Sequence, residues 1–261
     1  MSNKVTFGLF ADAQYALCSE SLGRQYGRSM EKVGLYLDIF RREQADFIVH
    51  LGDLIDDSGA ETGRALHDIT SLVESGEIPC HYLLGNHDVD MVDWRELTAL
   101  WHYPGSLPYY SFNQGDIHFV VLNSNCDEAG KVYLPTTGKW DRCFLDGPQL
   151  KWLEDDFSRN RQPLTVVFVH ALLDELDDPH VIINAGEARR ILEGSGGKLL
   201  VFQGHMHSGR RSETRGIPYY TLPGTVQGDT FCCWVVEVEG EEVRARIYTS
   251  LDKAGEECIL F

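Results

Sequence analysis

The sequence predicts an α/β protein in which two mixed β-sheets pack face to face, with helices on their outer sides. Two observations predict this class. Short apolar runs rich in branched residues alternate with helix-like segments through the first third of the chain, which is typical of βαβ units. The second half adds a hairpin pattern and adjoining runs that look antiparallel, so strands of both kinds are expected.

In the first third of the chain, the expected strands cover residues 5–10, 47–52 and 81–85. Between them, apolar side chains recur at helical spacing, first at Met30, Val33, Leu37 and Phe40 and then at Leu66, Ile69 and Leu72. This alternation predicts βαβ units and a sheet that helices cover.

The later elements follow in order. Residues 109–125 predict a hairpin that turns at 113–116, and Pro148 lies near the start of a helix at 146–157. Strands are expected at 164–170 and 198–205, and the helix between them, at 185–192, has Asn184 and Glu187 at the spacing of a capping box. Residues 218–224, 231–240 and 242–250 should add antiparallel strands.

Composition and charge limit the function classes. Residues 1–261 are expected to form one domain, because no linker, repeat or low-complexity tract interrupts them. No apolar run approaches the roughly 20 residues of a membrane helix, and the N-terminus resembles a first strand more than a signal peptide. The seven cysteines show no C-x-x-C spacing, which favours reduced thiols in the cytoplasm. A formal charge of −17 disfavours nucleic acid and anionic membranes as partners.

Polar residues gather at the expected carboxyl ends of five strands. The clusters are "ADAQ" (11–14), "GDLIDD" (52–57), "GNHD" (85–88), "VH" (169–170) and "GHMH" (204–207). In an open α/β sheet, such ends converge on one crevice where ligands bind, so the five clusters should meet in space. Each cluster alone has a structural explanation as a turn or a core histidine. Five clusters in order at strand ends favour a functional site.

The donor atoms of these clusters predict metal binding. Carboxylates, carboxamides and imidazoles without thiolates suit Mn, Mg, Fe, Ni or Zn rather than an iron–sulfur or structural zinc site. The candidate ligands are Asp12, Gln14, Asp53, Asn86, His170, His205 and His207, which are more than one ion normally takes. Two ions about 3.5–4 Å apart that share a bridging carboxylate would use them all and would suit a phosphoryl displacement.

The five clusters resemble the signature of the calcineurin-like metallophosphoesterases, written D-x-H, G-D-x-x-D, G-N-H-[DE], a lone H and G-H-x-H. The match runs from residue 12 to residue 207. The resemblance implies a four-layer α/β/β/α sandwich with a dinuclear metal centre. It also implies hydrolysis of phosphoric esters or anhydrides, in which a water or hydroxide between the two ions attacks phosphorus.

The resemblance also implies roles for individual residues. One ion would take Asp12, Gln14, Asp53 and His207, the other would take Asn86, His170 and His205, and Asp53 would bridge the two. His87 would lie near the leaving group as a proton donor or charge stabiliser. Asp88 is expected either to hydrogen-bond the imidazole and favour its charged form or to be a turn or N-cap carboxylate.

Gln14 departs from the common pattern, which has histidine at this position. "ADAQYA" resembles the D-x-Q-Y form of one branch, the manganese-dependent ADP-ribose/CDP-alcohol diphosphatases, and looser matches follow in "NAGEARRIL" and "GIPYYTLPGTVQG". An amide oxygen is a harder, neutral ligand than imidazole, which tilts the first site toward Mn or Mg. The implied substrate is a small nucleotide-like diphosphate or phosphodiester.

Three residues are expected to contact this substrate. Tyr15 and Trp140 would stack on a base or ribose, and Arg28, like the nearby Arg24, would pair with phosphate. Packing is the alternative explanation for Tyr15, and an exposed helix face is the alternative for the arginines. Residues 125–143 are expected either to form a lid that carries Tyr133 or Trp140 over a nucleotide or to be a surface loop with its own small cluster.

Other activities stay open at this point. The runner-up enzymes are a cyclic-nucleotide phosphodiesterase and a general phosphomonoesterase, and a different class is an inactive scaffold with the same fold. The ligand-type positions and His87 argue against the scaffold. The acidic chain argues against nuclease members of the superfamily. A purple acid phosphatase is also disfavoured, because Asp56 stands where that group has a ligating tyrosine.

Overall fold

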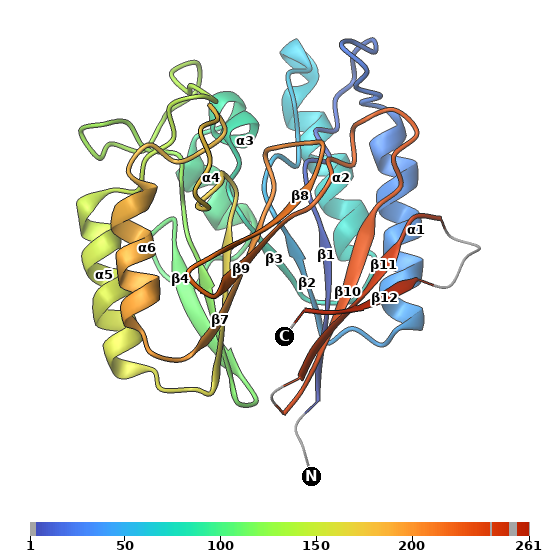
Figure 1. Cartoon of the computed structure of the whole chain (residues 1–261). Coiled ribbons are helices and arrows are strands. Elements are labelled where there is room, and N and C mark those ends of the chain that lie inside the picture. Colours follow the sequence, from blue (N-terminus) through green and yellow to red (C-terminus); the bar gives the residue numbers. More distant parts are fainter. Residues whose placement is uncertain (1–3, 241, 251–254, 261) are drawn as a thin grey trace.

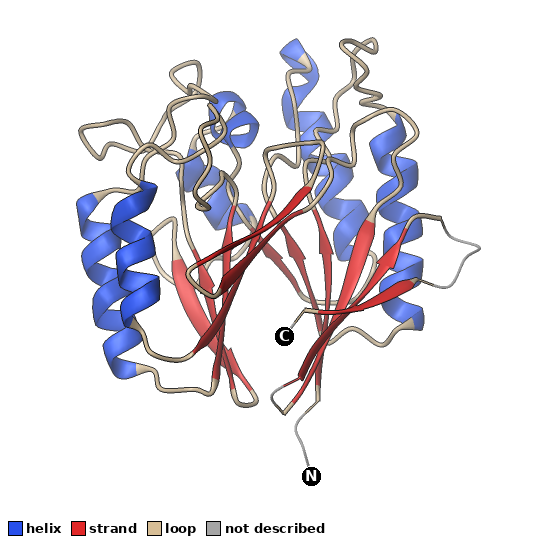
Figure 2. Ribbon diagram, viewed as in Figure 1, coloured by secondary structure: helices blue, strands red, loops and turns tan. Residues whose placement is uncertain are grey.

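A computed structural model of the chain describes residues 4–240, 242–250 and 255–260. Two six-stranded mixed sheets face each other, and helices form the outer layers on both sides (Figures 1 and 2). This arrangement confirms the predicted α/β class and its four layers.

The first sheet has the strand order β12-β11-β10-β1-β2-β3. Its parallel part consists of β1 (Val5–Phe10), β2 (Phe47–His50) and β3 (Cys80–Tyr82), and its antiparallel part consists of β10 (Cys233–Glu239), β11 (Glu242–Tyr248) and β12 (Glu256–Ile259). Two helices connect the parallel strands and cover this sheet, α1 (Arg28–Arg42) and α2 (Thr62–Glu74) (Figure 1). A short helical turn, η1 (Gly59–Glu61), precedes α2.

The second sheet has the strand order β4-β5-β6-β7-β9-β8. The predicted hairpin forms β4 (Tyr110–Gln114) and β5 (Ile117–Val121), which is followed in the sheet by β6 (Leu164–Val169), β7 (Lys198–Gln203), β9 (Ile217–Thr221) and β8 (Arg210–Thr214). Helices α5 (Gly147–Arg159) and α6 (Ala185–Gly194) cover it, while α3 (Asn86–Met91) and α4 (Trp94–Leu100) follow β3 (Figure 1). The antiparallel strand expected near 218–224 is β9. It is antiparallel to β8, as expected, but parallel to its other neighbour, β7.

One predicted helix start is wrong in its detail. Helix α6 does begin after Asn184, but the side chain of Asn184 makes no capping hydrogen bond. It instead binds the backbone N–H and C=O of Leu145, in the segment before α5. A tertiary contact therefore takes the side chain that the capping-box pattern assigned to the helix. By contrast, α5 is capped locally, because the Asp146 carboxylate accepts from the backbone N–H of Gln149.

Phenylalanines from both sheets fill the space between them. The ring of Phe7 in β1 contacts Phe119, Phe168 and Phe202 of the facing sheet edge-on, at centroid distances of 5.6, 6.0 and 6.2 Å. All four side chains are fully buried, and each such burial is worth about 1.5–3 kcal/mol. This packing fixes the two sheets against each other and thereby fixes the relative positions of their strand ends.

Candidate metal centre

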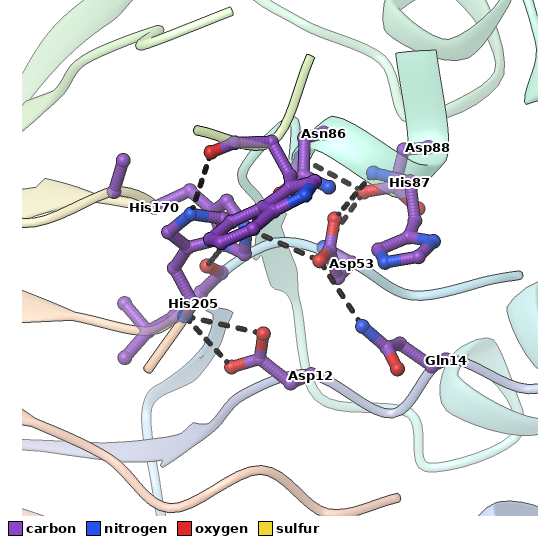
Figure 3. Close-up of polar contacts among 12 residues, drawn as sticks. Asp12, Gln14, Asp53, Asn86, His87, Asp88, His170 and His205 are labelled. Atoms are coloured by element: carbon purple, nitrogen blue, oxygen red, sulfur yellow. Dashed lines mark hydrogen bonds and ion pairs between the residues drawn. The ribbon is translucent and has the colours of Figure 1, made fainter. Parts of the chain in front are cut away.

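The five polar clusters lie together at the carboxyl ends of β1, β2, β3, β6 and β7, and the residues labelled in Figure 3 all belong to them. The seven candidate ligands come from these ends: Asp12 and Gln14 after β1, Asp53 after β2, Asn86 at the start of α3, His170 after β6, and His205 and His207 after β7. We call these seven residues the floor. All except His207 are buried, with at most 6% of the residue exposed.

The Asp53 carboxylate lies at the centre of the floor (Figure 3). Its Oδ2 atom is 3.2 Å from Nε2 of His170 and 3.3 Å from Nε2 of Gln14. Its Oδ1 atom accepts a hydrogen bond of 2.8 Å from the backbone N–H of His87. Asp53 therefore contacts two separate groups of donor side chains.

The first donor group contains Asp12, Gln14 and His207. Nε2 of His207 is 3.4 Å from Oδ1 of Asp12 and 3.3 Å from Nε2 of Gln14, while its Nδ1 is held by the side chain of Gln227 at 2.7 Å. Oε1 of Gln14 is buried and has no hydrogen-bond partner among the described residues. A buried acceptor without a partner costs about 1–3 kcal/mol, so this oxygen fits a bound cation.

The second donor group contains Asn86, His170 and His205. Nε2 of His170 is 3.1 Å from Oδ1 of Asn86, and the rings of His170 and His205 lie 4.9 Å apart. Ligand atoms of Asp53, His170 and His205 all lie within 4.8 Å of one another. Small side-chain adjustments can therefore bring these three groups onto one ion.

The histidines of the second group are oriented by backbone carbonyls. Nδ1 of His170 donates to the carbonyl oxygen of Leu51 at 2.8 Å, and Nε2 of His205 donates to that of Trp140 at 3.0 Å. Because a carbonyl can only accept, these nitrogens carry the proton in the neutral rings. The other nitrogen of each ring keeps its lone pair for a metal, which is how proteins usually orient metal-ligating histidines.

The floor favours cations electrostatically. Burial lowers the pKa of His170, but Asp53 and Asp12 outweigh this effect and raise it to about 9. Burial raises the pKa of Asp53, but His170 and His87 reverse the shift, so this pKa lies well below its usual value. Burial and the neighbouring His170 lower the pKa of His205 well below its usual range. Divalent ions would stabilise the same ionised carboxylates together with neutral imidazoles.

Four floor residues adopt a left-handed backbone conformation. Asp12, Gln14, Asp53 and His205 have φ angles of 51°, 41°, 57° and 67°. This conformation is uncommon outside glycine and costs about 1 kcal/mol or more per residue, and it clusters at functional sites. Asp12 and Gln14, two positions apart in one segment, both approach Nε2 of His207.

Two motif glycines are required by close packing around the floor. A Cβ atom at Gly85 would lie 2.1 Å from both N and Oδ1 of Asp53. A Cβ atom at Gly52, where φ is 94°, would lie 2.5 Å from Nδ1 of His170. The glycines of "GD" and "GN" therefore leave room for the floor.

His87 lies beside the floor and pairs with Asp56. Nδ1 of His87 is 3.1 Å from Oδ1 of Asp56, whose Oδ2 accepts from Nη1 of Arg24 at 3.3 Å. Burial lowers the pKa of His87, but Asp53 and the bonded Asp56 outweigh this effect and raise it to about 9. The surroundings therefore favour the protonated imidazole.

Asp88 makes no hydrogen bond with the imidazole of His87, which corrects its assignment as a catalytic residue. Its carboxylate is fully buried and accepts hydrogen bonds from four backbone N–H groups, those of Asp53, Leu54, Ile55 and Gly85. Asp88 is thus the N-terminal carboxylate of α3 and ties that helix to the turn after β2. The partner expected for His87 is supplied by Asp56 instead.

A cavity of about 320 Å³ opens above the floor. Besides His87 and floor residues, its lining contains three side chains from outside the five motifs, Arg24, Trp140 and His180, which we call the rim. The rim is more exposed than the floor: 26% of the Arg24 side chain, 29% of the His180 side chain and 47% of Trp140 are accessible.

The structure brings Trp140, but neither Tyr15 nor Arg28, to this cavity. Tyr15 is 7% exposed and packs into the main apolar core. Arg28 begins α1 and pairs with Asp229 at 2.7 Å. The alternatives of packing for Tyr15 and an exposed helix face for Arg28 therefore hold, and both predicted substrate contacts are corrected. Arg24 does reach the rim.

Residues 125–143 form a loop that is tied to the body of the protein. The carbonyl of Trp140 binds His205 and the backbone N–H of Gly138 donates to Asp90, while within the loop the hydroxyl of Tyr133 donates to the carbonyl of Arg142. Tyr133 is buried in the main core, so of the two aromatic residues considered, Trp140 is the one above the floor. That the loop moves as a lid stays a prediction.

Sequence reasoning missed two features of this site. The pairing of Asp56 with His87 was not foreseen, although Asp56 belongs to the G-D-x-x-D motif. His180 belongs to none of the five motifs and received no role from the sequence, yet it lines the cavity. The signal that could have indicated His180 is its position in the loop that follows His170 at the end of β6.

None of the helices in the described ranges is long and apolar enough to cross a membrane. The sequence pattern of the family described as calcineurin-like phosphoesterase matches residues 6–209. A human protein named serine/threonine-protein phosphatase CPPED1 is 27% identical over 236 residues, which cover 82% of this chain and 70% of the human protein.

Several solved structures share the fold. A dimetal phosphatase from Danio rerio has a TM-score of 0.80 at 20% identity and covers 98% of each chain. A purple acid phosphatase from yellow lupin (Lupinus luteus) has a TM-score of 0.68 at 13% identity, with 99% of this chain and 54% of that chain covered. GAP50, described as the anchor in the inner membrane complex of Plasmodium, has a TM-score of 0.65 at 12% identity, with 99% and 90% covered.

Proposed function

This chain belongs to the calcineurin-like phosphoesterase family, and from that premise we propose that it hydrolyses small nucleotide-like diphosphates or phosphodiesters of the ADP-ribose or CDP-alcohol type. Family membership makes it a metal-dependent phosphoester hydrolase. The proposal adds two divalent ions, manganese first among them, and specific roles for the floor and for His87.

The position of Asp53 between two donor groups carries the proposal. Asp12, Gln14 and His207 would hold one ion, Asn86, His170 and His205 would hold the other, and Asp53 would serve both. The buried Oε1 of Gln14 without a partner and the carbonyl-bound nitrogens of His170 and His205 support these roles. Gln14 offers an amide oxygen at a position where the family pattern has histidine. Because an oxygen is a harder ligand than imidazole, this supports Mn or Mg as the ion beside Asp12, Gln14 and His207.

When bound, two such ions supply an activated water and neutralise phosphoryl oxygens. The remaining chemistry belongs to His87, which donates a proton to the departing oxygen. Its Nδ1 is engaged with Asp56, so Nε2 is the nitrogen free to donate. Arg24, on the same carboxylate, adds positive charge beside the departing group, which suits a leaving phosphate.

The substrate proposal follows from the cavity and from charge. A cavity of about 320 Å³ is at the lower end of the usual range for small-molecule sites. The half-exposed indole of Trp140 can pack against a base. With a formal charge of −17, neither nucleic acid nor an anionic membrane is a proposed partner. The cysteines are all free in the structure, which supports a reducing cytoplasmic location.

A metal and substrate panel tests the proposal. Purified protein should carry about two divalent ions per chain, lose turnover on chelation and regain it best with manganese. ADP-ribose, CDP-choline, cyclic AMP, p-nitrophenyl phosphate and bis-p-nitrophenyl phosphate would then be compared. Preference for the first two supports the proposal, whereas preference for cyclic AMP supports the cyclic phosphodiesterase. Absence of both metal and turnover would favour the alternative of an inactive scaffold. GAP50, which shares this fold, is described as an anchor.

A phosphomonoesterase is the second candidate, because the human relative is named as a serine/threonine-protein phosphatase. The same floor and the same proton donor would serve a monoester. In the panel, this candidate predicts that p-nitrophenyl phosphate is hydrolysed faster than every diester and diphosphate.

A further inference from the structure

His180 is the rim residue that no motif explains. It lies in the loop between β6 and α6, and its imidazole lines the cavity. Its ring centroid is 5.0 Å from that of His205 and 5.2 Å from that of Trp140. Because 29% of its side chain is exposed, a substrate in the cavity can reach it.

Asp178 fixes the orientation and the tautomer of His180. Oδ1 of Asp178 is 2.5 Å from Nδ1 of His180 and also accepts the backbone N–H of His180 at 2.9 Å. A carboxylate accepts hydrogen bonds and donates none, so Nδ1 carries the proton of the neutral ring. In this neutral form Nε2 is a hydrogen-bond acceptor, and no described residue donates to it.

The cavity contains two different contact groups. Arg24, Asp56 and His87 form a chain of polar contacts, whereas Trp140, His180 and His205 form a cluster of rings. A diphosphate or diester likewise has two parts, the departing group and the part that stays bonded to the attacked phosphorus. The polar chain suits the departing group, which leaves the ring cluster for the retained part.

We propose that His180 is a specificity-determining residue whose Nε2 accepts a hydrogen bond from a sugar hydroxyl on the retained part of the substrate. Trp140 packs against the base of the same nucleoside. This inference rests on the proposed function and narrows its substrate class to compounds that carry a ribose hydroxyl beside the scissile phosphate. It assigns His180 no part in the bond-breaking step.

The expected discrimination is moderate. An acceptor aimed at a substrate hydroxyl disfavours the analogue that lacks it, because the acceptor is then left without its partner. The partial exposure of His180 lets water take the place of the missing hydroxyl. We therefore expect a preference of about 10-fold for the ribose form.

The test compares kcat/KM for CDP-choline with its 2′-deoxy and 3′-deoxy forms and with bis-p-nitrophenyl phosphate. The wild-type chain should prefer CDP-choline over one deoxy form by about 10-fold. His180→Phe keeps a ring but removes the acceptor. Its ratio of kcat/KM for CDP-choline to kcat/KM for the deoxy form should fall to about 1, and it should lose more activity on CDP-choline than on bis-p-nitrophenyl phosphate. His67→Phe is the matched control, because His67 also lies beside a carboxylate, that of Asp68, but is exposed on α2 outside the cavity.

Three results would overturn the inference. These are a wild-type ratio near 1 with both deoxy forms, an unchanged ratio in His180→Phe, and an equal loss of activity on all substrates with loss of metal, which indicates a structural role. The wild-type ratio needs no variant, so a ratio near 1 overturns the inference even if His180→Phe folds poorly. Failure of the proposed function is distinguishable, because the metal-loaded wild-type chain would then not hydrolyse CDP-choline at all, whatever its activity on bis-p-nitrophenyl phosphate.

Discussion

The floor and the rim line the same cavity, but they are held in different ways. Floor side chains follow strand ends within a few residues, and nearly all are buried. Rim side chains come from long connections: Arg24 between β1 and α1, Trp140 between β5 and α5, and His180 between β6 and α6. The strand ladders and the phenylalanine core immobilise the floor, whereas the rim depends on loop contacts.

The difference assigns different duties to the two regions. Groups held by rigid elements keep the geometry that bond-breaking needs. Loops tolerate sequence change and can adjust which substrate is accepted. Floor substitutions should therefore lower activity on every substrate, and rim substitutions should change the preference among substrates.

Asp53→Asn should have the largest effect. It removes the charge that contacts both donor groups, so kcat/KM should fall by at least about 10³-fold on every substrate. Bound metal, measured by elemental analysis, should fall below two ions per chain, while circular dichroism should show the same secondary structure. Full activity with two ions retained would end the bridging role of Asp53.

Substitution of His87 or Asp56, the pair beside the floor, should have the second-largest effect. His87→Ala and Asp56→Asn should keep both ions and lose about 10²-fold or more on poor leaving groups. The loss should be smaller with p-nitrophenyl esters, whose leaving group needs little protonation. Asp57→Asn is the control, because Asp57 is exposed and its carboxylate accepts only the backbone N–H of Gly59 among the described hydrogen bonds, while its backbone bond to Asp56 is kept. Loss of metal in His87→Ala would place His87 among the ligands instead.

Trp140→Ala should have a smaller and more selective effect. The hydrogen bond between Trp140 and His205 comes from the backbone carbonyl, so the substitution removes the indole and its ring contact with His205 but leaves that hydrogen bond. KM for nucleotide substrates should rise about 10-fold while kcat changes little. p-Nitrophenyl phosphate should be hardly affected. A fall in kcat on every substrate would break the distinction between floor and rim.

The smallest effect on activity is expected behind the floor, at Lys32. Its buried ammonium donates to the carbonyls of Thr225 and Gly228, in the loop that places Gln227 against His207. Burial, together with Arg28, lowers its pKa to about 8, so between pH 8 and about 10.5 the unfolded chain binds more protons than the folded one. The contribution of Lys32 to the free energy of unfolding should therefore rise with pH in this window.

Denaturant unfolding at pH 7 and pH 10 measures this effect. Wild-type protein should gain about 2 kcal/mol relative to Lys32→Met over that range. A difference between the two proteins that does not vary with pH would show that Lys32 is not desolvated.

The sequence predicted the fold class and the convergence of the floor, because apolar periodicity locates strands and polar clusters mark their ends. The rim was predicted unevenly. Trp140 and Arg24 were considered, His180 was overlooked, and Tyr15 and Arg28 were placed in a site that they do not reach. That residues 1–261 form a single domain stays a prediction.

By itself, then, the sequence determined the layers and the seven floor residues, since each lies at a point that short-range pattern defines. Only the tertiary structure decided which carboxylate serves His87, where Asp88 binds, and which side chains complete the cavity. The physical reason is sequence separation. Arg24 meets Asp56 across 32 residues and Trp140 meets His205 across 65 residues, and such contacts depend on how loops pack rather than on any local periodicity.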